Sequence, residues 1–193
     1  GSPPTSDPEN YSLEDFYEQL SGELVLSGKE PVYGRPDAKY TLVEFASYSC
    51  PHCAELAAPI KKLIARHGDL KLVHKLFVFD GHSPLSAQAA WCAHQQGRFW
   101  EMNDLLFANI GFTDRADLAF MAEKQIGLDP ELFSTCLDDP ASLEAVQADT
   151  SAGRDAGLNG TPTLYLGGAV PGEDWVKIVN GLDDAVDLLL VAA

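Results

Sequence analysis

The 193-residue chain is 46% hydrophobic and 22% charged, a composition typical of a globular domain and unlike disordered, collagen-like or coiled-coil chains. Its length fits one domain, or one domain that carries an insertion, and no apolar run approaches the roughly 18–20 residues of a membrane-spanning helix. Thirteen Lys and Arg residues against 29 Asp and Glu residues give a formal charge of -16, which disfavours binding to nucleic acid or to anionic lipid.

The first ten residues are predicted to be a disordered leader. Gly1 and Ser2 have the form of a cloning scar, and prolines follow among small polar residues, as in flexible segments. The chain shows no charged segment followed by an apolar one, so we expect an export signal of the natural protein to lie outside this sequence.

Residues 11–82 are predicted to contain a strand–helix–strand unit. The strand at 40–47 lacks polar alternation, as expected for a strand buried on both faces of a parallel sheet. The helix that follows has one apolar face, ends at Gly68 and contains Pro59, which is expected to kink it. In chain order we expect a short helix at 13–20, strands at 23–26 and 40–47, a helix at 54–67 and a strand at 70–79.

The next 75 residues, 83–157, are predicted to be wholly helical and to form an inserted domain. Asp129 is placed to cap a helix whose first residue is Pro130. The expected helices are 84–96, 98–109, 114–126, 130–138 and 141–156. Strands are expected again at 163–166 and 175–179, joined by a glycine-rich hairpin connection at 167–172 and followed by a helix at 183–191.

A Cys-Pro-His-Cys motif lies directly after the strand at 40–47 and opens the first long helix. A thiol at a helix N-terminus faces unsatisfied backbone N–H groups and the positive end of the helix dipole, so Cys50 is predicted to ionise readily. Pro51 has a backbone angle suited to the first turn, and His52 offers a donor and partial positive charge beside Cys50. A stabilised thiolate makes the Cys50–Cys53 disulfide an oxidant.

Metal binding is the alternative for this cysteine pair. A structural zinc site usually has four ligands, and the sequence holds no second Cys-x-x-Cys or His-x-x-x-His motif. We therefore expect a redox motif with no metal and no cofactor.

Glu44 is an unusual residue for an apolar strand and lies six positions before Cys50. A buried carboxyl beneath the cysteines would accept and return the proton of Cys53. Alternatively, Glu44 escapes at a sheet edge or pairs with Lys75. On the next strand both His74 and Lys75 are candidate neighbours, and the pattern does not distinguish them.

The Gly160-Thr161-Pro162 sequence precedes a strand and follows the helical segment. Taken alone, Pro162 is best interpreted as an ordinary trans proline at the start of a strand. Together with a Cys-x-x-Cys helix it favours a cis proline, which would leave the Thr161 backbone free to bind an extended peptide as an added strand.

Cys92 and Cys136 lie on apolar faces of two predicted helices. They are either two free buried thiols or a structural disulfide that closes a loop of about 45 residues and contributes about 4 kcal/mol. We favour the disulfide, which implies an oxidising compartment.

These motifs together resemble the DsbA-like thiol:disulfide oxidoreductases of bacteria, over roughly residues 40–191. The resemblance implies an α/β thioredoxin fold with an inserted all-helical domain, in which 11–82 and 158–193 form the thioredoxin-like domain and 83–157 the insertion. It also implies roles for the site residues: Cys50 as exposed nucleophile, Cys53 as buried partner, His52 as thiolate stabiliser, Glu44 as buried acid and Thr161-Pro162 as the cis-proline substrate loop. Cys92 and Cys136 resemble an extra disulfide of some members.

The expected function is the transfer of the Cys50–Cys53 disulfide to unfolded or reduced exported proteins in the periplasm or another extracytoplasmic compartment. The resemblance implies a quinone-linked membrane protein as reoxidant, and we expect a monomer. The alternatives are a reductase or isomerase on the same fold and a non-catalytic metal carrier. Tyr48, Trp91 and Trp100 either line a peptide groove or, as helical aromatics more often do, belong to the core.

Overall fold

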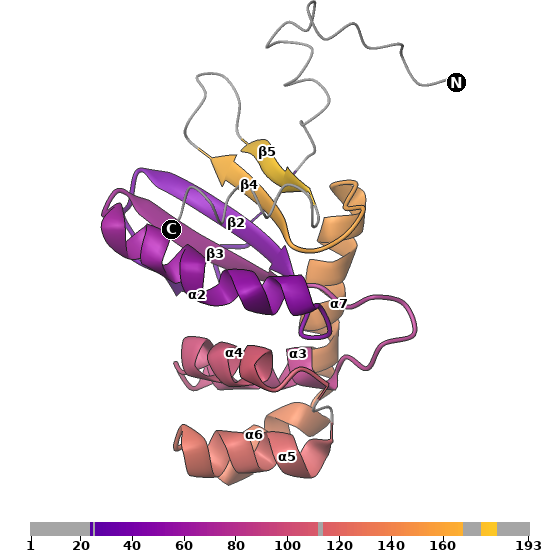
Figure 1. Cartoon of the computed structure of the whole chain (residues 1–193). Coiled ribbons are helices and arrows are strands. Elements are labelled where there is room, and N and C mark those ends of the chain that lie inside the picture. Colours follow the sequence, from indigo (N-terminus) through magenta and orange to yellow (C-terminus); the bar gives the residue numbers. More distant parts are fainter. Residues whose placement is uncertain (1–23, 25, 112–113, 168–174, 181–193) are drawn as a thin grey trace, which may run out of the picture.

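The computed structural model describes residues 24, 26–111, 114–167 and 175–180. In this part of the chain five strands form one mixed sheet in the order β1-β3-β2-β4-β5 (Figure 1). The strands are β1 (Val32–Tyr33), β2 (Tyr40–Ala46), β3 (Leu70–Leu76), β4 (Thr163–Gly167) and β5 (Trp175–Asn180). The pair β2 and β3 is parallel, as expected from a strand–helix–strand unit, and the other three pairs are antiparallel.

The two central strands are apolar on both faces because helices cover both sides of the sheet. Leu42 and Leu72 pack against α2 (Pro51–Arg66) on one face. Val43 and Phe45 face the opposite side, where the C-terminal end of α7 (Pro140–Asp155) packs. Side chains alternate between the faces along each strand, so the face of every residue in β2 and β3 is fixed.

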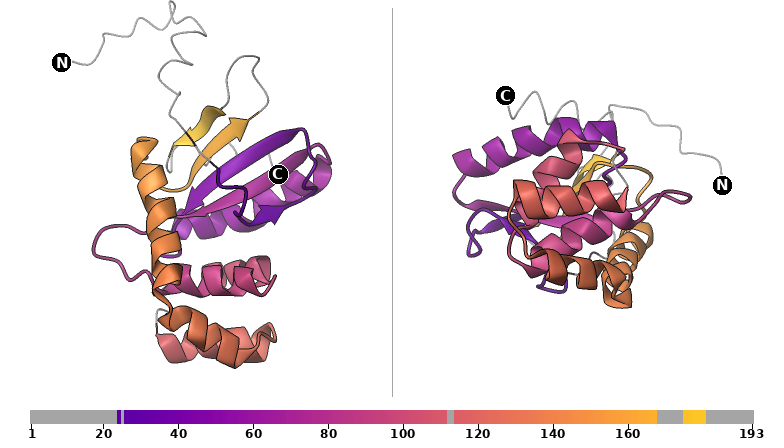
Figure 2. Two further views of the ribbon diagram at one scale, coloured as in Figure 1. Left: turned by 180° about the vertical axis from the view of Figure 1, so that it is seen from behind. Right: turned by 90° about the horizontal axis from the view of Figure 1, so that it is seen from below.

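The remaining helices stack below the sheet in two layers. Figure 1 shows α3 (Leu85–Gln95) and α4 (Phe99–Ala108) next to the sheet, with α5 (Arg115–Phe120) and α6 (Pro130–Asp138) beyond them. From behind, α7 runs from the end of α6 past the layer of α3 and α4 and along the sheet, and returns the chain to β4 (Figure 2). The close approach of α7 to the sheet needs Gly153, because a Cβ there would lie 2.9 Å from the ring of Phe77.

Helix α6 starts at the predicted capping residue, Asp129. Asp129 accepts hydrogen bonds from the N–H groups of Glu131 and Leu132, and Pro130 is the first residue of α6. Asp139 caps α7 in the same way, by accepting from Ala141. The prediction for α6 is confirmed at both ends, and α2 continues through Pro59 as one helix.

Several predicted elements need correction. The strand at 70–79 ends at Leu76, because the N–H of Val78 donates to the Thr150 hydroxyl on α7 rather than to a strand. The helix at 114–126 is two elements: after α5, the π-helix η1 (Met121–Gln125) ends with a hydrogen bond from Ile126 N–H to the Met121 carbonyl.

The N-terminal strand prediction is wrong where it can be checked, since neither Leu24 nor Leu26 belongs to a strand. Both leucines contribute to the apolar cluster on the α7 face of the sheet. The two-residue strand β1 was not predicted, because a run this short carries no periodicity. The predicted leader at 1–10, the helices at 13–20 and 183–191, and 168–172 of the predicted hairpin connection lie outside the described residues.

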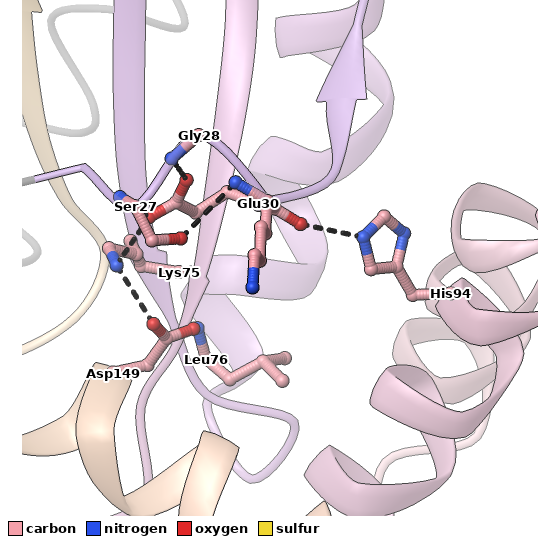
Figure 3. Close-up of polar contacts among 8 residues, drawn as sticks. Ser27, Gly28, Glu30, Lys75, Leu76, His94 and Asp149 are labelled. Carbon is pink, nitrogen blue, oxygen red and sulfur yellow. Dashed lines mark hydrogen bonds and ion pairs between the residues drawn. The ribbon is translucent and has the colours of Figure 1, made fainter.

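A buried ion network ties the segment before β1 to the sheet (Figure 3). Lys75 Nζ lies 2.9 Å from a carboxylate oxygen of Glu30 and 2.9 Å from one of Asp149. The Glu30 carboxylate also accepts the N–H groups of Ser27 and Gly28. Burial acts to raise the pKa of Glu30, but the Lys75 ammonium and these backbone donors outweigh it and lower the pKa to about 2.

The second cysteine pair forms a disulfide in this structure. Cys92 on α3 and Cys136 on α6 are joined with a Cα–Cα distance of 5.7 Å, across 44 positions of sequence. Cys92 is fully buried in the apolar cluster of the helical layers. The bond therefore links the inner helical layer to the outer one.

Removing this disulfide is expected to destabilise the protein without removing its dithiol chemistry. In the chain-entropy model a loop of this length contributes about 4 kcal/mol, so Cys92→Ala/Cys136→Ala should lower the free energy of unfolding by about that amount. Urea unfolding of the double variant against the wild type, both with the Cys50–Cys53 pair oxidised, measures the difference. A loss below about 1 kcal/mol would contradict a stabilising role.

Candidate active site

The Cys-Pro-His-Cys motif lies at the N-terminus of α2, where β2 ends. Cys50 is the N-cap residue, and its Sγ accepts a hydrogen bond from the Cys53 N–H at 3.3 Å. Pro51 occupies the first turn, where no intrahelical donor is required. The cysteine pair is thus held at the positive end of a 16-residue helix, as the sequence predicts.

Cys50 is less accessible than the resemblance implied, whereas Cys53 is buried as expected. Cys53 is fully buried, and Cys50, expected to be an exposed nucleophile, is only 8% exposed. The reason is the Thr161-Pro162 segment, which packs over the motif and brings the Thr161 carbonyl oxygen to 3.4 Å from the Cys50 sulfur. The remaining exposure belongs to Cys50 alone, so a reactant can reach this sulfur and not the other.

The two thiols differ strongly in acidity. A hydrogen bond from the Cys53 side chain is the largest influence lowering the pKa of Cys50, and burial opposes it. The backbone N–H groups of Cys53 and His52 lower it further, to about 6. Burial and the neighbouring Cys50 sulfur raise the pKa of Cys53 far above its usual range. At pH 7 Cys50 is therefore mainly a thiolate and Cys53 a thiol.

The His52 side chain contacts Glu55 on the same helix. Its Nδ1 lies 3.4 Å from a carboxylate oxygen of Glu55, and the imidazole is 39% exposed. The backbone N–H of His52 favours the Cys50 thiolate, and the expected stabilising role of the ring stays a prediction.

The peptide bond between Thr161 and Pro162 is cis. In its thiol form Cys50 donates to the Thr161 carbonyl, while the Thr163 hydroxyl donates to the Gly160 carbonyl at 2.7 Å and fixes the turn. The Thr161 hydroxyl is buried and has no hydrogen-bond partner within the described part of the chain. Residues 111 positions apart in sequence thus share one site.

Glu44 is 2% exposed and pairs with His74 on the neighbouring strand. A carboxylate oxygen of Glu44 lies 3.2 Å from His74 Nδ1. The alternative partner, Lys75, faces the opposite side of the sheet and binds Glu30 and Asp149 instead. The parallel register places Glu44 directly beside His74, which resolves the choice that the sequence left open.

The three aromatic residues considered for a peptide groove are packing residues. Tyr48 is buried and its hydroxyl donates to Asn103 at 2.9 Å. Trp100 donates to the Val32 carbonyl, and Trp91 packs against the helical core. A small cavity of about 50 Å³ does lie beside the motif, lined by the residues just before Cys50 and by the loop that leads into α3.

Comparison with known proteins identifies the fold and the family. The family model described as thioredoxin matches residues 26–182, which is most of the chain. The chain belongs to the thioredoxin family.

Two proteins have sequences similar to most of this chain. A sodium/proton antiporter NhaA from Herminiimonas arsenicoxydans is 34% identical over 138 residues, 71% of this chain and 22% of the antiporter. Disulfide bond formation protein D from Bacillus subtilis is 26% identical over 81% of this chain and 76% of its own length. The chain thus spans about a fifth of the antiporter relative and about three quarters of the disulfide-forming one.

Solved structures place the fold among DsbA-like proteins. Oxidised BdbD from Bacillus subtilis matches with a TM-score of 0.68 and 25% identity, over 90% of this chain and 97% of that one. The thiol-disulfide exchange protein alpha-DsbA2 from Wolbachia pipientis matches with a TM-score of 0.67 and 22% identity, over 85% and 87%. The predicted α/β thioredoxin fold with inserted helices is confirmed.

The structure also shows site features that the sequence analysis did not identify. The Thr161 carbonyl as acceptor for the Cys50 thiol and the stacking of Tyr48 on His74 both depend on contacts between distant segments. Among the described residues, no group of three or more His, Cys, Asp or Glu side chains has a metal-binding arrangement. Within the same residues, no helix has the length and hydropathy of a membrane span.

Proposed function

We propose that this chain is a thiol-disulfide oxidoreductase that acts as an oxidase, donating its Cys50–Cys53 disulfide to reduced proteins. The observation that most directly supports this proposal is the difference in acidity between the two thiols. The pKa of Cys50 is about 6, and the pKa of Cys53 lies far above its usual range. A thiolate that is stable in the reduced protein makes the reduced form favourable and the disulfide oxidising.

The reaction proceeds through two exchanges at Cys50. A substrate thiolate attacks Cys50 Sγ, the Cys50–Cys53 bond breaks, and its electron pair leaves on Cys53 Sγ, which takes up a proton. A second substrate thiolate then attacks the substrate sulfur of the mixed disulfide, and the electron pair leaves on Cys50 Sγ. The substrate loses two electrons and forms a disulfide, while the protein gains them as a thiol and a thiolate.

The neighbouring residues have supporting roles in this proposal. The backbone of Thr161, before cis-Pro162, aligns an extended substrate segment beside the sulfurs. Glu44 is the buried acid of the site, and Pro51 and the His52 backbone hold the helix terminus against the thiolate. These roles are supported by the contacts of the cis-proline turn and by the burial of Glu44.

The proposed substrates are unfolded or reduced exported proteins in an extracytoplasmic compartment, and the proposed reoxidant is a quinone-linked membrane protein. The Cys92–Cys136 disulfide supports an oxidising location. The chain is similar to part of a sodium/proton antiporter, which supports a location beside a membrane. It is also similar to a disulfide bond formation protein, which supports a compartment where disulfides form.

The reduction potential of the Cys50–Cys53 couple tests the proposal. We expect a value more positive than about -200 mV after equilibration with glutathione buffers at pH 7, in the range of oxidising and isomerising family members. A value near -270 mV would indicate a reductase and overturn the oxidase assignment. Stoichiometric metal in native mass spectra, removed by chelator, would favour the metal carrier instead.

A further inference from the structure

The loop that follows β3 and the Cys-Pro-His-Cys motif lie at the same end of the sheet. β2 and β3 are parallel, and Ala46 and Leu76 pair at their ends. The N–H of Phe77 donates to the Ala46 carbonyl at 3.0 Å, so the two segments leave the sheet side by side. Figure 1 shows the loop after β3 beside α7, at the end of the sheet where α2 begins. The carboxyl ends of parallel strands are the usual place for a ligand site in such sheets.

Two hollows open along this loop and meet. The cavity of about 50 Å³ beside the motif reaches residues 47–49, directly before Cys50. A larger hollow of about 400 Å³ lies between the loop and α7. Val78 and His82 line both hollows, which therefore form one groove that leads from the motif to α7. This loop–α7 groove is bounded by residues 78–84 on one side and 143–154 on the other.

Two contacts fix the loop on α7. The N–H of Val78 donates to the Thr150 hydroxyl at 3.2 Å, and Arg154 pairs with Asp80 at 2.5 Å. Between them the loop turns at Gly81, whose φ of +79° lies in the region that favours glycine. The walls of the groove are thus already joined, so an occupant would bind without first ordering the loop.

The lining of the groove combines apolar and polar side chains. Val78, Phe79 and Leu143 are only partly buried, so they present apolar surface to an occupant. Gln147 and Ser151 are exposed on α7 and offer hydrogen-bonding groups along the same wall. A hollow of this size and lining suits an apolar side chain together with part of a peptide backbone.

The order of the strands places the motif between this groove and the cis-proline turn. β3 lies on one side of β2, and β4 lies on the other. The loop that forms the groove follows β3, while Thr161 and Pro162 precede β4. Cys50 follows β2 and lies between them, with the Thr161 carbonyl 3.4 Å from its sulfur. A polypeptide that runs along Thr161 and crosses Cys50 therefore continues toward the groove.

We propose that the loop–α7 groove binds a second segment of the substrate polypeptide, with an apolar side chain of that segment on Val78, Phe79 and Leu143. This inference deepens the proposed function and rests on it. The occupant is an extended protein chain, and the groove selects for an apolar residue a few positions from the cysteine that reacts with Cys50. The groove thereby gives a preference among cysteines that the backbone contact at Thr161, open to any sequence, does not give.

The test measures how fast Cys50 reacts with single-cysteine peptides that differ at one position. Each peptide is a flexible Gly-Ser sequence whose cysteine is activated as a mixed disulfide with thionitrobenzoate. In a Cys53→Ser background the Cys50 thiolate attacks the peptide sulfur, and the electron pair leaves on the coloured thionitrobenzoate anion. A leucine or a serine is placed about two to six residues before or after the cysteine.

We expect leucine to raise the second-order rate constant about tenfold over serine, because the leucine side chain leaves water in the groove. The preference should appear on one side of the peptide cysteine only, since the groove lies on one side of Cys50. The measured quantity is the ratio of the leucine and serine rate constants in one protein. A change in the Cys50 thiolate affects both peptides and cancels in this ratio.

A groove-filling substitution and a matched control locate the preference. Gln147→Trp fills the groove from an exposed position of α7 and should abolish the leucine preference. Ala148 is exposed on the same helix and does not line the groove, so Ala148→Trp should retain the preference. If Gln147→Trp does not fold by circular dichroism, Ser151→Trp takes its place, because Ser151 lines the groove one turn further along α7.

Three results would overturn the inference. Wild type shows no leucine preference at any position, the groove-filling variant keeps the preference, or Ala148→Trp loses it equally. A wild-type dimer that Gln147→Trp converts to a monomer in sedimentation would place a second copy of the chain in the groove and would also overturn substrate binding there.

These outcomes are separate from the failure of the proposed function. The activated peptides react with the Cys50 thiolate whatever the reduction potential of the Cys50–Cys53 couple. The leucine preference therefore stays measurable even if a potential near -270 mV rejects the oxidase assignment.

Discussion

Replacing Cys50 with serine is expected to abolish oxidation of a reduced peptide, a loss of at least about 10³-fold, because a hydroxyl at this position neither forms a disulfide nor leaves as a stable anion. Cys53→Ser should instead accumulate a mixed disulfide when it is given the disulfide-bonded form of the peptide: the Cys50 thiolate attacks the peptide disulfide, one peptide sulfur leaves as a thiolate, and no Cys53 thiol remains to resolve the product. The structure gives the reason: only Cys50 is reachable, and its pKa is about 6. Peptide oxidation followed by fluorescence, and non-reducing electrophoresis for the trapped species, measure the two results.

The matched control for these variants is Cys92→Ala/Cys136→Ala, which removes the other two cysteines and leaves the exchange pair intact. It should oxidise peptide at the wild-type rate, if the assay is run well below its unfolding temperature. A mixed disulfide trapped by Cys50→Ser would reverse the assignment of nucleophile and partner. The absence of a mixed disulfide with Cys53→Ser would reject that assignment.

The stability of the reduced protein is expected to rise with pH relative to the oxidised protein between about pH 6 and 8.5. The pKa of Cys50 is about 6 in the folded protein and about 8.5 in an unfolded chain, so the unfolded chain binds more protons between these values. The stabilisation is fully present above about pH 8.5 and is lost as pH falls through 6. Its full extent is about 3 kcal/mol, of which about 1.4 kcal/mol is present at pH 7.

Urea unfolding of both redox forms from pH 5 to 9 measures this gap. The oxidised protein has no thiol at position 50 and is therefore the internal reference at every pH. Reduced Cys50→Ser should lose the pH-dependent part. Parallel stability curves for the reduced and oxidised wild type would show that Cys50 ionises like an ordinary thiol, and the proposed oxidising power would lose its cause.

The local sequence pattern was sufficient to predict the helices and strands that position the Cys-Pro-His-Cys motif. The apolar run of β2, the helix that opens at Cys50 and the capped start of α6 at Asp129 each depend on neighbours a few residues away. Errors arose where the outcome depends on a distant segment. The end of β3 is decided by the Thr150 hydroxyl of α7, and the short strand β1 exists only because β3 lies beside it.

The site shows the same division between near and distant contacts. The four-residue Cys-Pro-His-Cys motif is enough to predict a Cys50 thiolate at a helix N-terminus, because the backbone donors that favour the anion belong to the motif itself. The partner of Glu44, the closeness of the Thr161 carbonyl to Cys50 and the limited exposure of Cys50 follow from the register of two strands and the path of a returning loop. Those contacts join residues 30 and 111 positions apart, and only folding into a common sheet and core brings such residues into hydrogen-bond range.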